Sequence, residues 1–307
     1  MRMQYAFPRV QVLPDWERVN FQVDGVERFS YRYPRESQRP FLFPVSGVSG
    51  VGLTRMGHPN PVGHEHHKSV WFGHQKVNGL NFWEERGGTD VRVRHQRVVL
   101  IHEGPEWSGL VADLEWWGSG RAYLNQRLTL VLEPLGERDY AIDLQSRFEA
   151  PNGPVDLGQT NFGFLGVRVA KSLSEQFGGG RLLNDQGATG ERAIFGKPSR
   201  WVDYSGPSRP DQQEGICYLD HPSNPNHPTS WHVRQDGWME AAFNLRGPHG
   251  VARDHPLDLR YRLLVHHGHL SVADGTKAWE RFAATPPYQI LPATGGGLTG
   301  LRRQPAD

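Results

Sequence analysis

Apolar and polar residues alternate with a period of two over many short segments of the chain. In 140–148 (YAIDLQSRF), Tyr140, Ile142, Leu144 and Phe148 fall on one face. A half-buried β-strand produces this pattern, because successive side chains of a strand point to opposite sides of the sheet. Segments of the same kind are RVQVLP (9–14), RFSYRYP (28–34), DVRVRHQRVVLIHEG (90–104), GLVADLEWW (109–117), RAYLNQRLTLVLEP (121–134), FLGVRVA (164–170), GICYLD (215–220) and LDLRYRLLVHHG (257–268).

Glycine and proline separate these segments, with 36 Gly and 23 Pro in the chain. Such residues form the turns of antiparallel sheets. The sequence therefore predicts an all-β protein, a large antiparallel β-sandwich with few short helices. We expect one domain over residues 1–307, because the chain shows neither a repeat of fixed period nor a long linker.

One segment near the end of the chain has helical spacing instead. The stretch 271–285 (SVADGTKAWERFAAT) offers Asp274 as an N-cap, with Trp279 and Phe282 three residues apart. This spacing predicts one short helix packed on the sandwich. From about residue 290 the glycine-rich tail has little to bury, and we expect it to be loose.

The charge balance limits the classes of partner. Lys and Arg number 34 and Asp and Glu 33, for a formal net charge of +1, and the basic residues are scattered. A nucleic-acid binder needs a basic patch, so we expect a small molecule as partner and no nucleic acid. No window reaches the roughly 18 apolar residues of a membrane-spanning helix. The N-terminal prolines and charges do not fit a secretory signal, which favours a cytoplasmic location. The sequence leaves the oligomeric state undecided.

Four of the chain's 15 histidines, His64, His66, His67 and His74, lie within GHEHHKSVWFGH (63–74). If this stretch is a strand, the first, second and last of them share a face, and residues two apart are about 6.6 Å apart. His64 and His66 are then candidate metal ligands, although a metal site needs a third protein ligand. Candidates for that ligand are Glu84, His227, His232, His267 and His269. Metal binding and metal-free acid/base catalysis both stay open.

Ten tryptophans accompany these histidines, and several lie beside polar residues. Trp71 and Trp83 flank His74 and Asn78 in the sequence. An indole ring offers a flat apolar surface for the CH-rich side of a sugar, while neighbouring polar groups bind its hydroxyls. This combination favours a carbohydrate as the small-molecule partner.

A second histidine segment, YLDHPSNPNHPTSWHVR (218–234), contains three prolines. Because proline fixes φ, this loop is predicted to be rigid and to present His221, Asn224, Asn226, His227 and His232 in set directions. We expect these side chains to converge with those near His66.

Four segments together resemble a bacterial family catalogued as PmoA-like ("methane oxygenase PmoA"), a domain of unassigned function. They are RPFLFPVSGVSGVGLTR (39–55), HEHHKSVWFGHQKVNGLNFWEE (64–85), WVDYSG (201–206) and HPSNPNHPTSWHVR (221–234). The family's run Asp-His-Pro-His-His-Arg-Ser departs here at Gly63, Glu65 and Lys68, whereas Arg168 matches the arginine of a family Gly-Val-Arg-Val motif. The resemblance implies, at the level of fold, a galactose mutarotase-like supersandwich, whose members bind or transform sugars.

The leading hypothesis is a carbohydrate-active enzyme of epimerase, mutarotase or lyase type that uses histidine general acid/base chemistry. One histidine accepts a proton, and a neighbour kept protonated by Glu84 or Glu65 donates one. The candidate catalytic residues are His66, His67, Glu84 and His232. The candidate substrate-binding residues are His64, Trp71, His74, Asn78, Trp83, Arg168, Asn224, His227 and Trp231.

Two alternatives stay open. The first is a metal-dependent hydrolase, lyase or oxygenase with a His-x-His site, and the second is a non-catalytic sugar-binding module. The leading hypothesis has no cofactor, with a divalent metal ion as the alternative.

Overall fold

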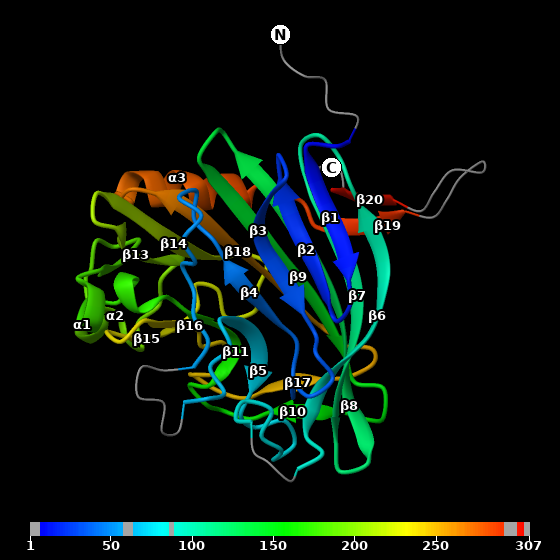
Figure 1. Ribbon diagram of the computed structural model, residues 1–307. Coiled ribbons are helices and arrows are strands. Elements are labelled where there is room, and N and C mark those ends of the chain that lie inside the picture. Colours follow the sequence, from blue (N-terminus) through cyan, green and yellow to red (C-terminus); the bar gives the residue numbers. More distant parts are fainter. Residues whose placement is uncertain (1–6, 58–63, 86–88, 292–299, 304–307) are drawn as a thin grey trace.

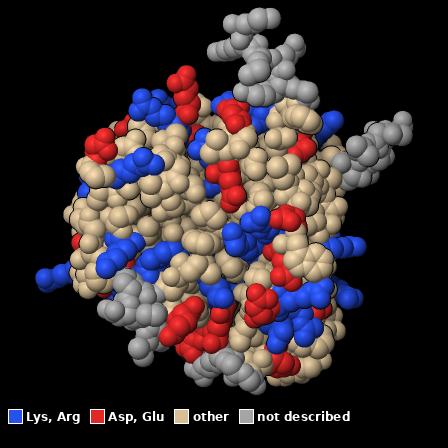
Figure 2. All heavy atoms as spheres, in the orientation of Figure 1, with Lys and Arg blue, Asp and Glu red and all other residues tan. Residues whose placement is uncertain are grey.

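The computed structural model of the chain describes residues 7–57, 64–85, 89–291 and 300–303. Two eight-stranded antiparallel sheets form most of it (Figure 1). The predicted all-β sandwich is thereby confirmed. In Figure 2, basic and acidic side chains are interspersed on the face shown. No helix of the described residues is long and apolar enough to cross a membrane.

The first sheet joins strands from both halves of the chain. Its order is β1 (Val10–Asp15), β2 (Arg18–Val23), β3 (Val26–Arg32), β4 (Phe41–Val45), β5 (Val70–His74), β11 (Gly163–Arg168), β16 (Trp238–Ala241) and β15 (Trp231–Arg234). The second sheet runs β12 (Arg181–Asn184), β13 (Trp201–Arg209), β14 (Gln212–Asp220), β18 (Leu257–His267), β9 (Asp139–Glu149), β8 (Arg121–Leu135), β7 (Ser108–Gly118) and β6 (Arg92–His102).

Short elements complete the fold. Two small two-stranded sheets pair β10 (Val155–Leu157) with β17 (His249–Val251), and β19 (Tyr288–Leu291) with β20 (Gly300–Arg303). The helices are η1 (Lys171–Leu173), α1 (Glu175–Gly178), α2 (Glu191–Ile194) and α3 (Val272–Ala283). Helix α3 confirms the predicted helix, but its N-cap is Ser271, whose Oγ accepts a hydrogen bond from the Asp274 backbone N–H at 3.1 Å.

The described part of the tail is anchored, contrary to the expectation of a loose end. Leu301 of β20 is buried and belongs to an apolar cluster with Val111 and Val131 of the second sheet. Arg303 donates a hydrogen bond to the carboxylate of Glu133 at 2.5 Å. A short strand with one buried leucine therefore holds a segment whose composition alone predicts little burial.

The main core lies between the two sheets, and the alternation along β15 and β16 separates it from the opposite face. Trp231 and Val233 belong to this core. Their neighbours His232 and Arg234 point to the other side of the sheet, because successive side chains of a strand alternate. A second aromatic cluster occupies that other side, with Phe41, Trp71, Trp83 and Trp238 as its buried members. This outer face of the first sheet carries the candidate site.

Candidate functional site

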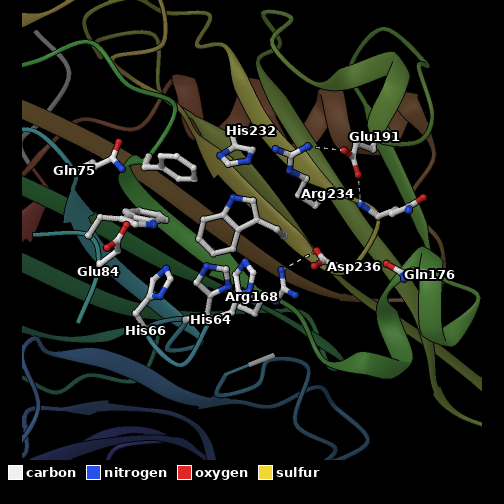
Figure 3. A pocket seen from close by; sticks show the side chains of 15 residues that line it. His64, His66, Gln75, Glu84, Arg168, Gln176, Glu191, His232, Arg234 and Asp236 are labelled. Carbon is white, nitrogen blue, oxygen red and sulfur yellow. Dashed lines mark hydrogen bonds and ion pairs between the residues drawn. The ribbon is translucent and has the colours of Figure 1, made fainter. Parts of the chain in front are cut away.

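A pocket of about 410 Å³ lies on the outer face of the first sheet, and we call it the central pocket (Figure 3). Side chains of strands β11, β15 and β16 line one side of the central pocket, and side chains of the loops before and after β5 line another. Its lining residues are His64, His66, His67, Gln75, Trp83, Glu84, Phe162, Arg168, Gln176, Glu191, His232, Arg234, Gln235, Asp236 and Trp238.

Three aromatic rings, those of Trp83, Phe162 and Trp238, form the floor of the central pocket. The ring centroids of Trp83 lie 5.8 Å from Phe162 and 5.5 Å from Trp238. Gly166 makes room for this arrangement, because a Cβ at that position would lie 2.4 Å from the indole of Trp238. The floor is rigid, since aromatic side chains have few rotatable bonds and pack here against the sheet.

His64, His66 and His67 gather at one side of this floor. Their ring centroids are 6.1 Å apart for His64 and His66, 5.0 Å for His64 and His67, and 4.5 Å for His66 and His67. The predicted strand geometry is wrong here, because residues 64–66 form a turn and β5 begins only at Val70. A strand would place His64 and His66 on one face and His67 on the other, whereas the turn brings all three rings together.

His232 approaches the floor from strand β15. Its Nδ1 donates a hydrogen bond to the backbone carbonyl oxygen of Asn161 at 2.8 Å. A carbonyl can only accept, so Nδ1 carries the proton and Nε2 of the neutral ring is the acceptor. The ring centroids of His232 and Phe162 are 5.3 Å apart, which places the imidazole at the edge of the floor.

Glu240 lies behind His232 on the neighbouring strand β16. Its side chain is 0% exposed, and one carboxylate oxygen accepts a hydrogen bond from the backbone N–H of Gly163. The other oxygen lies 3.4 Å from Nδ1 of His232. Burial raises the pKa of Glu240 above its ordinary value. The register of β15 and β16 places the two residues opposite each other, so sheet pairing alone brings a carboxyl group to this imidazole.

Two arginine–carboxylate pairs form the polar wall. Arg168 is 1% exposed, and its Nη1 lies 2.8 Å from a carboxylate oxygen of Asp236. Nε and Nη2 of Arg168 are buried without a hydrogen-bond partner among the described residues. Arg234 contacts Glu191 at 2.8 Å, and the same carboxylate accepts from the backbone N–H of Gln235 at 2.8 Å. In Figure 3 these pairs lie across the pocket from His66 and Glu84.

The protonation states of the histidine cluster differ from those expected. Burial, together with the charges of Arg39 and His64, lowers the pKa of His66 to about 4. Glu84 and Glu65 act in the opposite direction but do not outweigh burial. Burial also holds the pKa of His67 far below its usual range. Both rings are therefore neutral near pH 7, and the prediction of a protonated histidine beside the base is wrong.

No metal-binding group was found in the described ranges. There, no set of three or more His, Cys, Asp or Glu side chains is arranged to hold a metal ion. Of the candidates for a third ligand, Glu84 and His232 line the central pocket. His227, His267 and His269 do not line it, and His267 instead contacts Asp139 at 2.8 Å.

Residues 18–280 match the model of a family of unknown function, DUF6807. The chain belongs to this family. The expectation of a family without assigned function is thus confirmed, while the narrower PmoA-like resemblance stays a prediction. No curated protein matches the chain. A similar solved structure is the 4-alpha-glucanotransferase from Thermococcus litoralis, with 10% sequence identity and a TM-score of 0.29; the match covers 84% of this chain and 39% of that protein.

Thirteen residues were candidates for catalysis or substrate binding on the basis of the sequence. Seven of them line the central pocket of this DUF6807 member. They are His64, His66, His67, Trp83, Glu84, Arg168 and His232. Eight other lining residues were not predicted from the sequence. Only Trp238 had a sequence signal, because it is an indole four residues after Arg234 in a strand–turn–strand pattern. The missed residues are Gln75, Phe162, Gln176, Glu191, Arg234, Gln235, Asp236 and Trp238.

Three candidates near β5 do not line the pocket. Trp71 is buried beneath the floor, with its ring centroid 5.1 Å from that of Trp238. His74 is 0% exposed and donates from Nε2 to the carbonyl oxygen of Gly158 at 3.1 Å. Asn78 lies in a turn and accepts a hydrogen bond from the backbone N–H of Asp156 at 2.7 Å. Trp71 supports the site, whereas the contacts of the other two are structural.

Of the candidates in the segment 218–234, only His232 lines the central pocket, so the predicted convergence with the segment near His66 is wrong for the other three candidates. Asn224 is buried and donates to Asp220 at 2.7 Å. His227 also contacts Asp220 at 2.7 Å, and its ring stacks on Trp279 of α3. Trp231 is buried in the main core, where Nε1 donates to the carbonyl oxygen of Ser199 at 2.8 Å. The loop therefore packs against α3, and only the strand after it reaches the pocket.

Proposed function

We propose that the chain is a carbohydrate-active enzyme of isomerase or lyase type, in which His232 is the general base of the central pocket. One observation carries the proposal. Histidines from two distant segments flank a floor of three aromatic rings in a pocket of about 410 Å³. That volume lies within the range of sites for single small ligands, about 300–1,000 Å³.

The aromatic floor fits the less polar side of a sugar ring. Phe162 is the partly exposed ring of this floor, and Trp83 and Trp238, each 2% exposed, pack against it. CH groups of a pyranose pack well on such an aromatic surface. Around the floor stand amide, carboxylate and guanidinium groups that hydrogen-bond hydroxyls.

The hydrogen bond to Asn161 orients His232 so that Nε2 is the acceptor nitrogen of its neutral ring. Because Nδ1 donates to Asn161, Nε2 takes the proton from a sugar hydroxyl or an acidic C–H group. The imidazolium that forms carries its positive charge 3.4 Å from the carboxyl group of Glu240. Glu240 thus stabilises the charge that develops in the reaction, as a carboxylate does behind a catalytic histidine in general.

His66 stands across the floor from His232 in Figure 3 and stays neutral. A neutral imidazole can still donate a hydrogen bond to an oxygen that gains negative charge. In this scheme the proton removed from the sugar resides on Nε2 of His232, and His66 stabilises the resulting oxyanion. Return of the proton from Nε2 to a neighbouring atom on the same side of the sugar gives isomerisation, and departure of a β-substituent with its bonding electron pair gives elimination.

The sequence resemblance to the PmoA-like family also supports a carbohydrate as the ligand. That resemblance implies a mutarotase-like supersandwich, a fold associated with sugar binding, and the sandwich architecture is in keeping with it. Fold-level analogy does not identify a reaction, so the proposal rests on the pocket.

The test is turnover of a panel of aldoses, ketoses and uronic acids followed by NMR, with wild type, His232→Gln and His102→Gln. His102 lies on β6 and does not line the central pocket, so its variant is the matched control. We expect His232→Gln to lower the rate by about 10²–10⁴-fold, the usual contribution of a general base. The control should retain the wild-type rate.

Two results contradict the proposal. Saturable sugar binding without any product assigns the pocket to a non-catalytic binding module. Turnover that survives His232→Gln unchanged removes His232 as the base.

A further inference from the structure

Two further hollows adjoin the central pocket. The first, of about 1,000 Å³, lies beside α1, α2 and β15 and shares Glu191, Arg234 and Gln235 with the central pocket. We call it the α2 hollow. The second, of about 800 Å³, includes residues 158–161 and shares Gln75 with the central pocket. We call it the 158–161 hollow.

Phe195 lines both hollows and joins them beside the catalytic histidine. Its ring centroid lies 5.3 Å from that of His232. The guanidinium of Arg234 lies over the Phe195 ring at 4.9 Å and is held there by Glu191 at 2.8 Å. Phe195 and Arg234 thus form a ridge where the three depressions meet.

The combined depression exceeds the needs of one monosaccharide. The central pocket alone already has the volume of a typical small-molecule site. Both flanking hollows are open to solvent, and shared lining residues make their surfaces continuous with the central pocket. A ligand that fills only the central pocket leaves the ridge and both hollows unused.

The chemistry of the 158–161 hollow matches hydroxyl groups. Gln75, Gln159, Thr160 and Asn161 contribute amides and a hydroxyl, and such groups both donate and accept hydrogen bonds. Thr160 donates to the side-chain oxygen of Gln75 at 2.8 Å, which fixes the orientation of that amide at the border of the two depressions. Sugar hydroxyls likewise both donate and accept, so the hollow suits a second sugar unit.

The same segment also holds the proposed base. Asn161 lines the 158–161 hollow, and its backbone carbonyl accepts the hydrogen bond that fixes the His232 ring. A sugar unit bound in this hollow therefore contacts the segment that orients His232.

We propose that the site takes an oligosaccharide chain, with one sugar unit in the central pocket and neighbouring units in the α2 and 158–161 hollows. This inference rests on the proposed function and narrows its substrate class. Binding energy from the flanking units then orients the reacting unit.

The experiment measures binding by isothermal titration calorimetry with malto-, cello-, xylo- and chito-oligosaccharides of one to six units. For at least one series, we expect the affinity to rise tenfold or more between one and three units. The variant Gln159→Ala removes an exposed amide from the 158–161 hollow. It should weaken binding of the three-unit ligand at least threefold and leave binding of the monosaccharide unchanged.

Gln96→Ala is the matched control. Both glutamines are exposed and each donates one hydrogen bond, Gln159 to the carbonyl of Leu245 at 3.0 Å and Gln96 to Glu115 at 3.4 Å. Arg192→Ala in the α2 hollow provides a second variant, so that a folding defect in one does not decide the result. The control should bind every chain length as wild type does.

The outcomes separate this inference from the proposed function. If a monosaccharide binds and His232→Gln abolishes its turnover, but affinity is the same at every chain length, the oligosaccharide inference is wrong and the proposed function stands. If no sugar of any length binds or reacts, both are wrong.

Discussion

The Cα of Gly166 on β11 lies against the indole of Trp238, so closely that a Cβ at this position would be 2.4 Å from Cη2 of the ring. Strand β16, which carries Trp238, pairs directly with β11. The absence of one side chain therefore lets an indole lie on the sheet and complete the floor of the central pocket. A glycine in a strand often marks such a close approach.

Gly166→Ala is expected to displace the Trp238 ring. Overpacking at a tight site costs about 1–3 kcal/mol of unfolding free energy, and the displaced ring should also weaken sugar binding. Urea unfolding and calorimetric titration measure the two effects. Gly52→Ala is the control, because its added Cβ meets only the carbonyl oxygen of Thr54 at 3.9 Å. Equal stability and equal binding in both variants would show that the Trp238 position does not depend on Gly166.

Glu240→Gln tests the carboxyl group behind His232. The glutamine keeps the shape and can retain the hydrogen bond from Gly163, but it removes the group's capacity for negative charge. We expect the rate constant of turnover to fall about tenfold, which corresponds to roughly 1.4 kcal/mol of lost charge stabilisation, with little change in KM. The rate should also show an altered pH profile, because Glu240 acts through the imidazolium form of His232. A change in KM alone would indicate a purely structural role.

The buried histidines predict a loss of stability in mild acid. Burial lowers the pKa of His74 to about 4 from its ordinary value of 6.5. The unfolded chain therefore binds more protons than the folded chain between these values, and the free energy of unfolding falls as the pH is lowered through this window. For His74 alone, lowering the pH from 7 to 5 should remove roughly 2 kcal/mol.

The variant His74→Gln isolates this contribution. Denaturant unfolding at pH 7 and pH 5 should show a smaller difference for the variant than for wild type. His255→Gln serves as the control, because His255 is exposed and its removal should leave the difference unchanged. A variant with the same pH dependence as wild type would show that His74 does not remain neutral in the folded chain.

The period-two alternation was sufficient to identify most long strands. The segment 140–148 became the centre of β9, with Tyr140, Ile142, Leu144 and Phe148 in the main core. This prediction succeeds because the side-chain direction in a strand depends on local backbone geometry alone. Alternation gave no indication of sheet order, since the pairing of β5 with β11 joins residues about ninety positions apart in the chain.

The histidine turn and the proline-rich loop show where local reasoning ends. His64, His66 and His67 came together through a turn, although the sequence was consistent with a strand. In the loop, His227 was satisfied by Asp220 and Trp279, partners that no local pattern indicates. Whether a polar side chain already has a hydrogen-bond partner depends on which residues the rest of the chain places beside it.

The sequence by itself determined the class of fold and the residue types of the site, because strand periodicity and side-chain chemistry are local properties. Only the tertiary structure decided that His232 faces His66 across an aromatic floor, and that Glu240 lies behind it. Those relationships arise from strand pairing between β11, β16 and β15, and the hydrogen bonds that fix such a register join residues distant in the chain.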